Sequence, residues 1–192
     1  MIKKLNLFLF LIIFYFFSQN FSFANIQGKI INNLQQTDTL SFDFIQKIGD
    51  KDEIGNCYIK FSYLIKCIYT DEKEKIIISN GRTLAVVKKK YKKVYLYPIK
   101  KTPLFTILDK RKILDLVKNN NPIKINKNII KFLYIGKNNE KLKIFFDKNT
   151  FNIAGWETKD SYSNTVIFDI FNVEKNIPLD KKFFKIPRVE DL

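Results

Sequence analysis

Residues 76–87 read Ile76-Ile77-Ile78-Ser79-Asn80-Gly81-Arg82-Thr83-Leu84-Ala85-Val86-Val87, two apolar runs separated by Asn-Gly. Asn-Gly between apolar runs is the strongest short signal for a β-hairpin, because both turn residues must take positive φ. The stretch therefore predicts two antiparallel strands joined by a tight turn. We expect the rest of the chain to form further antiparallel strands joined in the same way.

The segments on either side show the same alternation of apolar and polar residues, broken by short turns rich in Asn, Asp, Gly and Lys. The pattern predicts about ten sequential strands and no long linker or internal repeat. Besides the central hairpin, strands are expected at residues 40–47, 57–61, 65–69, 91–97, 129–135, 141–146, 151–158, 165–173 and 182–186.

Two places along the chain change to helical spacing. Apolar residues recur at helical intervals over 26–36, which predicts one amphipathic helix before the strands. In the middle, Thr102 is suited to cap a short helix whose first residue is Pro103. Asp109 is suited to cap a second helix, which ends before Pro122.

These elements predict one α+β domain over residues 25–192. Along residues 141–146, Leu142, Ile144 and Phe146 alternate with lysines, so one face of the sheet is expected to be buried. Two or three short helices are too few to cover ten to eleven strands in full. We expect an incomplete, half-open antiparallel β-barrel that wraps a lid or plug of helices, with an interior that is either packed solid or left as a cavity.

Residues 1–24 have the three-part pattern of a cleaved signal peptide. Lys3 and Lys4 precede an almost wholly apolar run, and Ser22 and Ala24 supply the small residues before a cut after Ala24. The alternative is an uncleaved anchor, but the run is shorter than the roughly 18–20 apolar residues that a spanning helix needs. We expect export to the periplasm.

The two cysteines, Cys57 and Cys67, lie symmetrically about Ser62 in strands of equal parity. Equal parity places both sulfurs on one face of a hairpin, opposite each other. In an oxidising compartment we expect a structural disulfide. The alternative is a pair of small buried apolar side chains.

The composition excludes several kinds of chemistry. The chain has no histidine, which excludes Ser-His-Asp and Cys-His triads and imidazole metal sites, and two cysteines cannot complete a four-cysteine zinc site. No Gly-rich phosphate loop is present, and no pair of carboxylates is singled out by its spacing. We expect no enzyme, cofactor or metal.

The formal net charge of +15 comes almost wholly from lysine, since only Arg82, Arg111 and Arg188 are arginines among 34 basic residues. Nucleic-acid readers favour the planar fork of arginine, so we expect no nucleic-acid partner. The lysines are scattered and accompany abundant Asn, Ile and Phe, which A/T-rich codons would explain. A functional basic face is the alternative.

The order of motifs resembles the LolA-type periplasmic carriers of outer-membrane lipoproteins, over nearly all of residues 26–187. The segments that carry the resemblance are Phe42-Asp43-Phe44-Ile45-Gln46, Ile78-Ser79-Asn80-Gly81-Arg82-Thr83-Leu84, Lys101-Thr102-Pro103-Leu104-Phe105-Thr106-Ile107-Leu108-Asp109, Gly155-Trp156-Glu157-Thr158-Lys159-Asp160 with Asn164-Thr165-Val166, and Phe183-Phe184-Lys185-Ile186-Pro187.

The resemblance implies an open antiparallel barrel whose apolar concavity is covered by helices, without catalytic residues or cofactor. It implies a monomeric carrier that takes acylated lipoproteins from an inner-membrane ABC exporter and passes them to an outer-membrane receptor. The alternative within the same fold is a lipid-sensing regulator or a general lipid-binding protein of the periplasm.

The resemblance also assigns roles to individual residues. The lid surface is expected to consist of Ile30, Leu34, Leu104, Phe105, Ile107 and Leu108. The cavity wall is expected to contain Phe42, Phe44, Phe61 and Trp156, although each of these could instead be an ordinary core residue.

One position departs from the family pattern. Many relatives carry Arg-Pro where this chain has Phe61-Ser62, and the arginine ties the lid shut. Closure of the lid therefore needs another contact, and Lys60 or Lys66 could replace the arginine only in part.

Overall fold

The computed structural model describes residues 25–70, 74–136, 139–160 and 162–192. The predicted signal segment, residues 1–24, lies outside them. A helix over residues 25–35 precedes eleven strands. The strands are β1 (Thr39–Ile48), β2 (Lys51–Lys60), β3 (Leu64–Tyr69), β4 (Lys75–Asn80), β5 (Thr83–Lys88), β6 (Lys93–Pro98), β7 (Lys124–Ile125), β8 (Ile129–Ile135), β9 (Lys141–Asp147), β10 (Ile153–Lys159) and β11 (Thr165–Lys175). The remaining elements are the 3₁₀ turns η1 (Lys89–Tyr91), η2 (Ile99–Lys101), η3 (Lys181–Phe184) and η4 (Val189–Asp191), and the helices α2 (Leu104–Ile107) and α3 (Lys110–Asn119).

All eleven strands form one antiparallel sheet in the order β6-β5-β4-β3-β2-β1-β11-β10-β9-β8-β7. Strands that follow each other in the chain are neighbours, with one exception. The exception is β6 and β7, which lie at the two opposite edges of the sheet. Strands β1 and β11, the first and last in the chain, pair at the middle of the sheet and join two meanders. The sheet does not close on itself, since β6 and β7 remain as separate edges, and the predicted half-open barrel is confirmed.

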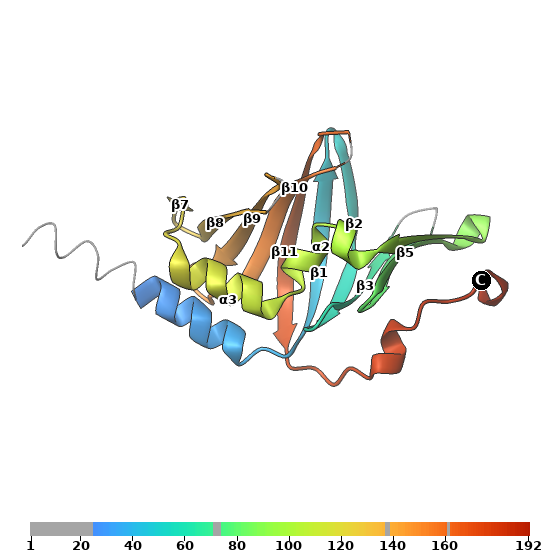
Figure 1. Ribbon diagram of the computed structural model, residues 1–192, viewed down its shortest axis with the longest axis horizontal. Helices are drawn as coiled ribbons and strands as arrows, with labels where there is room; N and C mark the ends of the chain where they lie inside the picture. Colours follow the sequence, from blue (N-terminus) through green and yellow to red (C-terminus); the bar gives the residue numbers. More distant parts are fainter. Residues whose placement is uncertain (1–24, 71–73, 137–138, 161) are drawn as a thin grey trace, which may run out of the picture.

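The helices lie together on one face of the curved sheet (Figure 1). The main core fills the space between them: Ile30 of the N-terminal helix, Leu108, and Val117 of α3 are buried against inward-facing strand residues. In β9 the predicted alternation holds, because Leu142 and Ile144 belong to this core. The helices thus cover the inner face of the sheet.

The outer face has a smaller apolar cluster of its own. Ile76, Ile78, Ala85 and Val87 of β4 and β5 pack there, with Ile186 from the C-terminal segment against them. The C-terminal segment therefore covers part of the outer face of one half-sheet.

The prediction of a last strand at residues 182–186 is wrong. The 3₁₀ turn η3 begins there instead, because the Asp180 side chain accepts a hydrogen bond from the Lys182 N–H. The ring of Phe183 packs edge-on against Tyr58, with centroids 5.0 Å apart, and Phe184 is buried. The cap at Asp180 and the packing of the two phenylalanine rings therefore favour a 3₁₀ turn here, although the alternation of residues 182–186 predicts a strand.

Two further local predictions need correction. Only Gly81 of the Asn80-Gly81 turn has positive φ, because Asn80 ends β4 and its Oδ1 accepts hydrogen bonds from the Arg82 and Thr83 N–H groups. Thr102 does not cap α2; its hydroxyl donates to Ile99 O. The predicted cap at Asp109 is confirmed, since its side chain accepts from two backbone N–H groups of α3.

Candidate functional site

An apolar cavity of about 140 Å³ lies between the inner face of the sheet and α2. Pro103, Leu104 and Ile107 line it on the helix side. On the sheet side it is lined from five strands, and Trp156 and Phe168 contribute the largest apolar side chains. The helix α2 therefore roofs part of an apolar space on the inner face of the sheet.

The floor of the cavity is built on a row of aromatic rings that crosses the sheet. Trp156 stacks on Phe168 at 4.3 Å between centroids, Phe168 on Phe44 at 4.5 Å, and Phe44 meets Tyr69 edge-on at 4.8 Å. Strand β2 lies between Phe44 and Tyr69, and its residue there is Gly55, the register partner of both. A Cβ at Gly55 would lie 2.9 Å from the Phe44 ring, so the absence of a side chain lets the row continue over β2.

A disulfide joins Cys57 and Cys67, which are register partners in β2 and β3. Both side chains are buried on the inner face, and Cys67 lines the cavity. The disulfide therefore lies in the floor beside the aromatic row, and it ties β3, which lines the cavity, to its neighbour β2.

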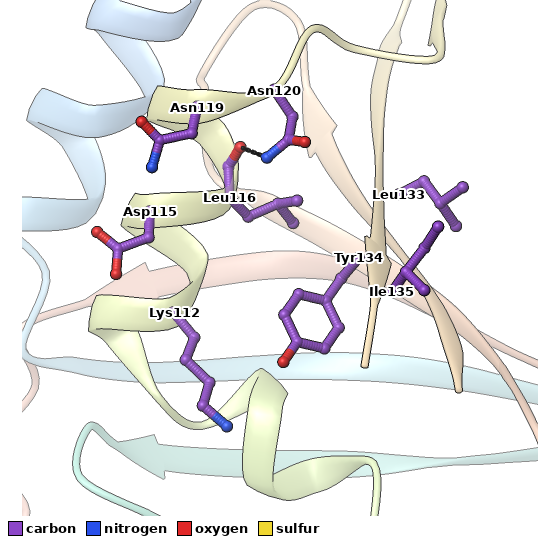
Figure 2. A pocket seen from close by; sticks show the side chains of 8 residues that line it. All are labelled: Lys112, Asp115, Leu116, Asn119, Asn120, Leu133, Tyr134 and Ile135. Atoms are coloured by element: carbon purple, nitrogen blue, oxygen red, sulfur yellow. Dashed lines mark hydrogen bonds between the residues drawn. The ribbon is translucent and has the colours of Figure 1, made fainter. Parts of the chain in front are cut away.

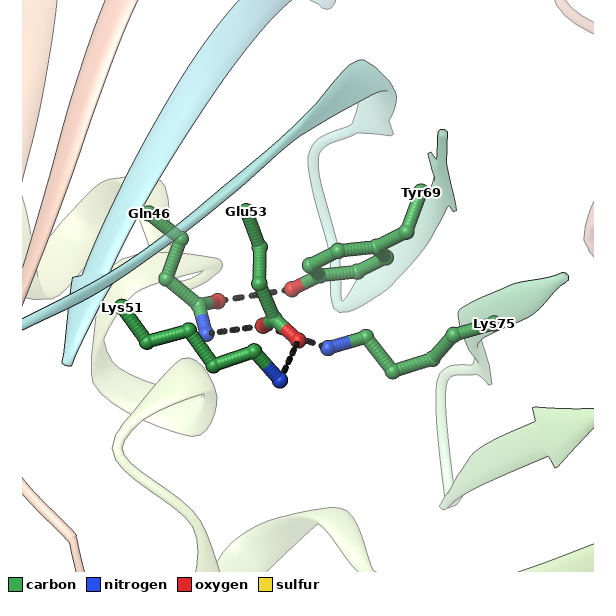
Figure 3. A network of polar contacts seen from close by, with 5 residues as sticks. All are labelled: Gln46, Lys51, Glu53, Tyr69 and Lys75. Carbon is green, nitrogen blue, oxygen red and sulfur yellow. Dashed lines mark hydrogen bonds and ion pairs between the residues drawn. The ribbon is translucent and has the colours of Figure 1, made fainter. Parts of the chain in front are cut away.

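A polar network closes one end of the cavity (Figure 3). Tyr69 Oη donates to Gln46 Oε1 at 2.7 Å, and Gln46 Nε2 donates to Glu53 Oε2 at 3.1 Å. Glu53 pairs with Lys75 at 2.6 Å and with Lys51 at 3.5 Å, and the Glu53 and Lys75 side chains are only 10% and 15% exposed. Since Gln46 and Tyr69 both line the cavity, this end has a polar boundary whose groups are already paired.

The turn between β2 and β3 holds the roof from outside. Ser62 and Tyr63 both have positive φ, 88° and 73°, which directs Tyr63 over the helices. The Tyr63 ring stacks on Phe105 of α2 at 4.8 Å, and its hydroxyl donates to Asp109 Oδ2 at 2.6 Å. The hydrogen bond to Asp109 raises the pKa of Tyr63 above its usual range. We call Tyr63, Phe105 and Asp109 the lid latch.

A second contact joins the same regions. Lys110 at the start of α3 pairs with Asp38 at 3.0 Å and lies over the Phe61 ring at 5.4 Å. Lys60 and Lys66, the lysines considered as replacements for the family arginine, both face the outer side of the sheet. Lys60 donates to Leu179 O, and Lys66 lies 4.2 Å from the Phe183 ring centroid. Neither lysine holds the lid; the lid latch and Lys110 do.

The N-terminal helix braces α3 from the other side. Gln27 Nε2 donates to the carbonyls of Val117 and Asn120 at 2.8 Å. Asn33 Nδ2 donates to Asn152 Oδ1 at 2.8 Å, beside β10. The N-terminal helix is thus fixed to both α3 and the β10 end of the sheet, and α2, with four residues, is the shortest helix of the cover.

A more open groove of about 420 Å³ lies between α3 and the end of β8 (Figure 2). Leu116 and Tyr134 face each other across it, and Lys112, Asp115 and Asn120 form its polar side. The groove therefore borders α3 of the helical cover.

The structure places the residues expected to form the wall and the lid in three settings. Trp156, Leu104 and Ile107 line the cavity. Phe42, Phe44, Ile30, Leu34 and Leu108 are buried in the main core, where Phe44 supports the cavity floor. Phe61 and Phe105 lie at the lid contacts outside the cavity, against Lys110 and Tyr63.

Three important residues were not singled out from the sequence: Phe168, Tyr69 and Tyr63. Phe168 and Tyr69 lie at inward positions of predicted strands. The alternation along each strand could therefore have placed both side chains on the inner face. Tyr63 directly follows the Phe61-Ser62 pair at which the family arginine is missing. In the part of the chain that the structure describes, no group of three or more His, Cys, Asp or Glu side chains is placed to hold a metal ion. Among the same residues, no helix has the length and apolar character needed to cross a membrane.

The family model described as outer membrane lipoprotein carrier protein LolA matches residues 35–187. No curated protein gives a significant match to the chain. The match extends from the end of the N-terminal helix to Pro187, so it covers the whole sheet, the cavity, α2 and α3.

Solved structures with a similar fold come from several bacteria. A LolA superfamily protein from Nitrosomonas europaea is 11% identical, with 85% of this chain and 97% of that chain covered and a TM-score of 0.44. An uncharacterized conserved protein from Thermus thermophilus is 6% identical, with 86% and 94% covered and a TM-score of 0.51. The MucA/MucB complex of Pseudomonas aeruginosa gives 5% identity, 86% and 61% coverage and a TM-score of 0.47. At such identities the likeness concerns the fold alone.

Proposed function

Since the chain belongs to the LolA family of outer membrane lipoprotein carrier proteins, we propose that it carries lipoproteins across the periplasm with their acyl chains bound beneath α2. The observation that supports this most directly is the apolar cavity roofed by Pro103, Leu104 and Ile107. The proposal includes export by the segment 1–24 and cleavage after Ala24. It also includes the partners that the family implies, an inner-membrane ABC exporter and an outer-membrane receptor.

The cavity is small for an acyl chain. Its volume of about 140 Å³ is below the range of about 300–1,000 Å³ that is usual for pockets holding drug-sized ligands. An acyl chain therefore requires the roof to move. The helix α2 has four residues and is held from outside by the lid latch, so it is the element that we expect to move.

The closed form also accounts for release. Burial of an acyl chain is worth about 0.8 kcal/mol per CH₂ group, so a rigid, preformed pocket would retain its cargo. When α2 closes over the empty cavity, Leu104 and Ile107 bury their own apolar surface there. Opening the lid costs this burial, which offsets part of the gain from cargo binding.

Native mass spectrometry of the protein purified from the periplasm tests the proposal. A co-purified triacylated lipoprotein supports the carrier function. Free phospholipid without lipoprotein contradicts it and supports a general lipid-binding or lipid-sensing protein. A protein that is empty, and that takes up no lipoprotein when mixed with one, contradicts both functions.

A further inference from the structure

One long segment of the chain carries basic side chains with no acidic one among them. Residues 76–108 contain eight basic side chains and no acidic one, which is more than half of the formal excess of +15. Within this segment no acidic neighbour in the sequence balances the positive charge. The eight residues are Arg82, Lys88, Lys89, Lys90, Lys92, Lys93, Lys100 and Lys101.

The fold places this segment at one edge of the sheet. Strand β6 pairs only with β5, so its other side is an edge. Lys89, Lys90, Lys92 and Lys93 are exposed around η1 at one end of β6, and Lys100 and Lys101 are exposed at its other end. In Figure 1 this edge is the end of the sheet beyond β5. We call residues 88–101 the basic edge.

Exposed aromatic and apolar side chains lie between the two groups of lysines. Tyr95, Leu96 and Tyr97 of β6 are 40%, 61% and 46% exposed. Tyr95 pairs with Val86, and Tyr97 with Leu84, a residue of the main core, so both tyrosines lie on the face of the sheet that bears the lid. Three consecutive exposed large side chains between lysine clusters are unusual for a solvated strand.

Tyrosine and lysine together match the chemistry of a bilayer surface. Tyrosine rings favour the boundary between acyl chains and water, because one end of the side chain is apolar and the other polar. Lysines near an anionic bilayer each contribute about 1 kcal/mol of attraction. We propose that the basic edge docks on a lipid bilayer that carries anionic headgroups.

Other polyanionic partners fit less well. The basic edge is built from lysine, whereas recognition of nucleic acid and of carboxylate-rich proteins favours the bidentate fork of arginine. Lysines on an edge strand also oppose pairing with a strand of another protein. One acidic residue, Glu74, borders the surface, since its backbone carbonyl accepts a hydrogen bond from the Lys89 N–H. Five lysines lie within residues 88–93, so the surface keeps a positive charge.

Electrostatics at η1 agree with a concentrated positive potential. The pKa of Lys66 is lowered, first by burial and then by the neighbouring charge of Lys89. Repulsion of this kind is relieved by an anionic surface, which is a reason for η1 to bind one.

The position of the basic edge in the chain relates it to the lid. The turn η2 contains Lys100 and Lys101 and is followed, after Thr102 and Pro103, by α2. A bilayer that contacts the basic edge therefore lies next to the movable roof of the cavity. Bilayer docking itself does not require that the cavity hold any ligand.

Co-sedimentation with lipid vesicles tests the docking surface. The chain from Asn25 onward is mixed with vesicles of phosphatidylcholine, and with vesicles in which part of this lipid is replaced by phosphatidylglycerol. We expect binding to the anionic vesicles only, and its loss in high salt, because raising the ionic strength from 0.1 M to 1 M shortens the Debye length from about 10 Å to about 3 Å.

Two matched variants locate the surface. The variant K89Q/K90Q/K92Q/K93Q should bind anionic vesicles on the order of a thousandfold more weakly. The control K118Q/K124Q/K127Q/K141Q removes the same number of exposed lysines at the opposite end of the sheet, and should keep the affinity within about threefold. Circular dichroism of both variants checks that the fold is kept.

The proposal is overturned if the protein binds neutral and anionic vesicles equally, if it binds neither, or if the two quadruple variants lose affinity to the same extent. Capture of nucleic acid or of an acidic protein in preference to anionic vesicles also overturns it. A lid variant, Leu104→Asp, separates docking from cargo binding: vesicle docking should be unchanged, whether or not the proposed carrier function holds.

Discussion

The hydroxyl of Tyr63 donates a 2.6 Å hydrogen bond to Oδ2 of Asp109, and this contact joins the β2–β3 turn to the residue that caps α3. The same tyrosine stacks on Phe105 of α2. One side chain thus contacts both α2 and the N-terminal cap of α3. It does so one position beyond the Phe61-Ser62 pair, where the family pattern has Arg-Pro.

Tyr63→Phe should loosen the cover while keeping the stack on Phe105. The variant removes a hydrogen bond to a nearly buried carboxylate, and we expect a loss of about 1–2 kcal/mol in the free energy of unfolding. Hydrogen exchange of the amides in residues 104–117 should become faster. Tyr58→Phe is the matched control, because Tyr58 packs on Phe183 at the outer face; equal exchange rates in the two variants would contradict the lid latch.

The lid latch should also weaken at high pH. The pKa of Tyr63 is raised by its hydrogen bond to Asp109, so the contact is complete below the pKa of an unfolded tyrosine, about 10. Stability from the contact is lost as the pH rises through the higher pKa of the folded state. The difference in denaturation midpoint between the wild type and Tyr63→Phe should be constant up to about pH 10 and then shrink. A difference that does not change with pH would show that the phenol proton is not involved.

Leu104→Asp should abolish retention of acyl ligands. Leu104 lines the cavity, and a carboxylate there is costly to bury against an alkyl chain. Thr106→Asp, on the same helix but not in the cavity lining, should retain the ligand. Mass spectrometry of bound lipid, with a thermal melt to check folding, measures both. Equal retention by the two variants would place the acyl chain elsewhere.

Gly55→Ala should destabilise the protein by about 1–3 kcal/mol. The added Cβ would lie 2.1 Å from Ile68 O and 2.9 Å from the Phe44 ring, so the strand or the aromatic row must shift. Gly28→Ala is the control: nothing lies within 4 Å of its Cβ, and alanine in a helix should stabilise by about 0.5–1 kcal/mol. Chemical denaturation measures the change in the free energy of unfolding for both variants. If Gly55→Ala were as stable as the wild type, the close approach of the Gly55 backbone to Ile68 O and the Phe44 ring would be contradicted.

The elements whose signals are local were predicted well from the sequence. The strand at residues 129–135 has the predicted bounds, and the cap at Asp109 is the predicted one. Both depend on neighbours within a few residues, such as alternation along one strand or a side chain that reaches its own helix.

The remaining features depend on contacts that are distant in sequence. Nothing in residues 39–48 or 165–175 indicates that they pair, since the register from Leu40 to Ile48 is set by the whole sheet. The contact of Tyr63 with the helices could not be predicted, because Ser62 and Tyr63 both have positive φ. Positive φ is rare for residues other than glycine. The cavity lining likewise required knowing which inward positions lie under α2.

The central pairing of β1 with β11 has a consequence for how the protein is made. Strand β1 is the first strand to be synthesised, yet one of its sides is completed only by residues 165–175. Until those residues arrive, a ten-residue strand has a bare edge, and such edges are sites of aggregation. A sheet whose middle is closed by its first and last strands also folds slowly, because the long loop must be closed before the contacts form. The newly made chain is therefore expected to leave one side of β1 unpaired until β11 arrives, and truncation before residue 165 should leave that side unpaired for good.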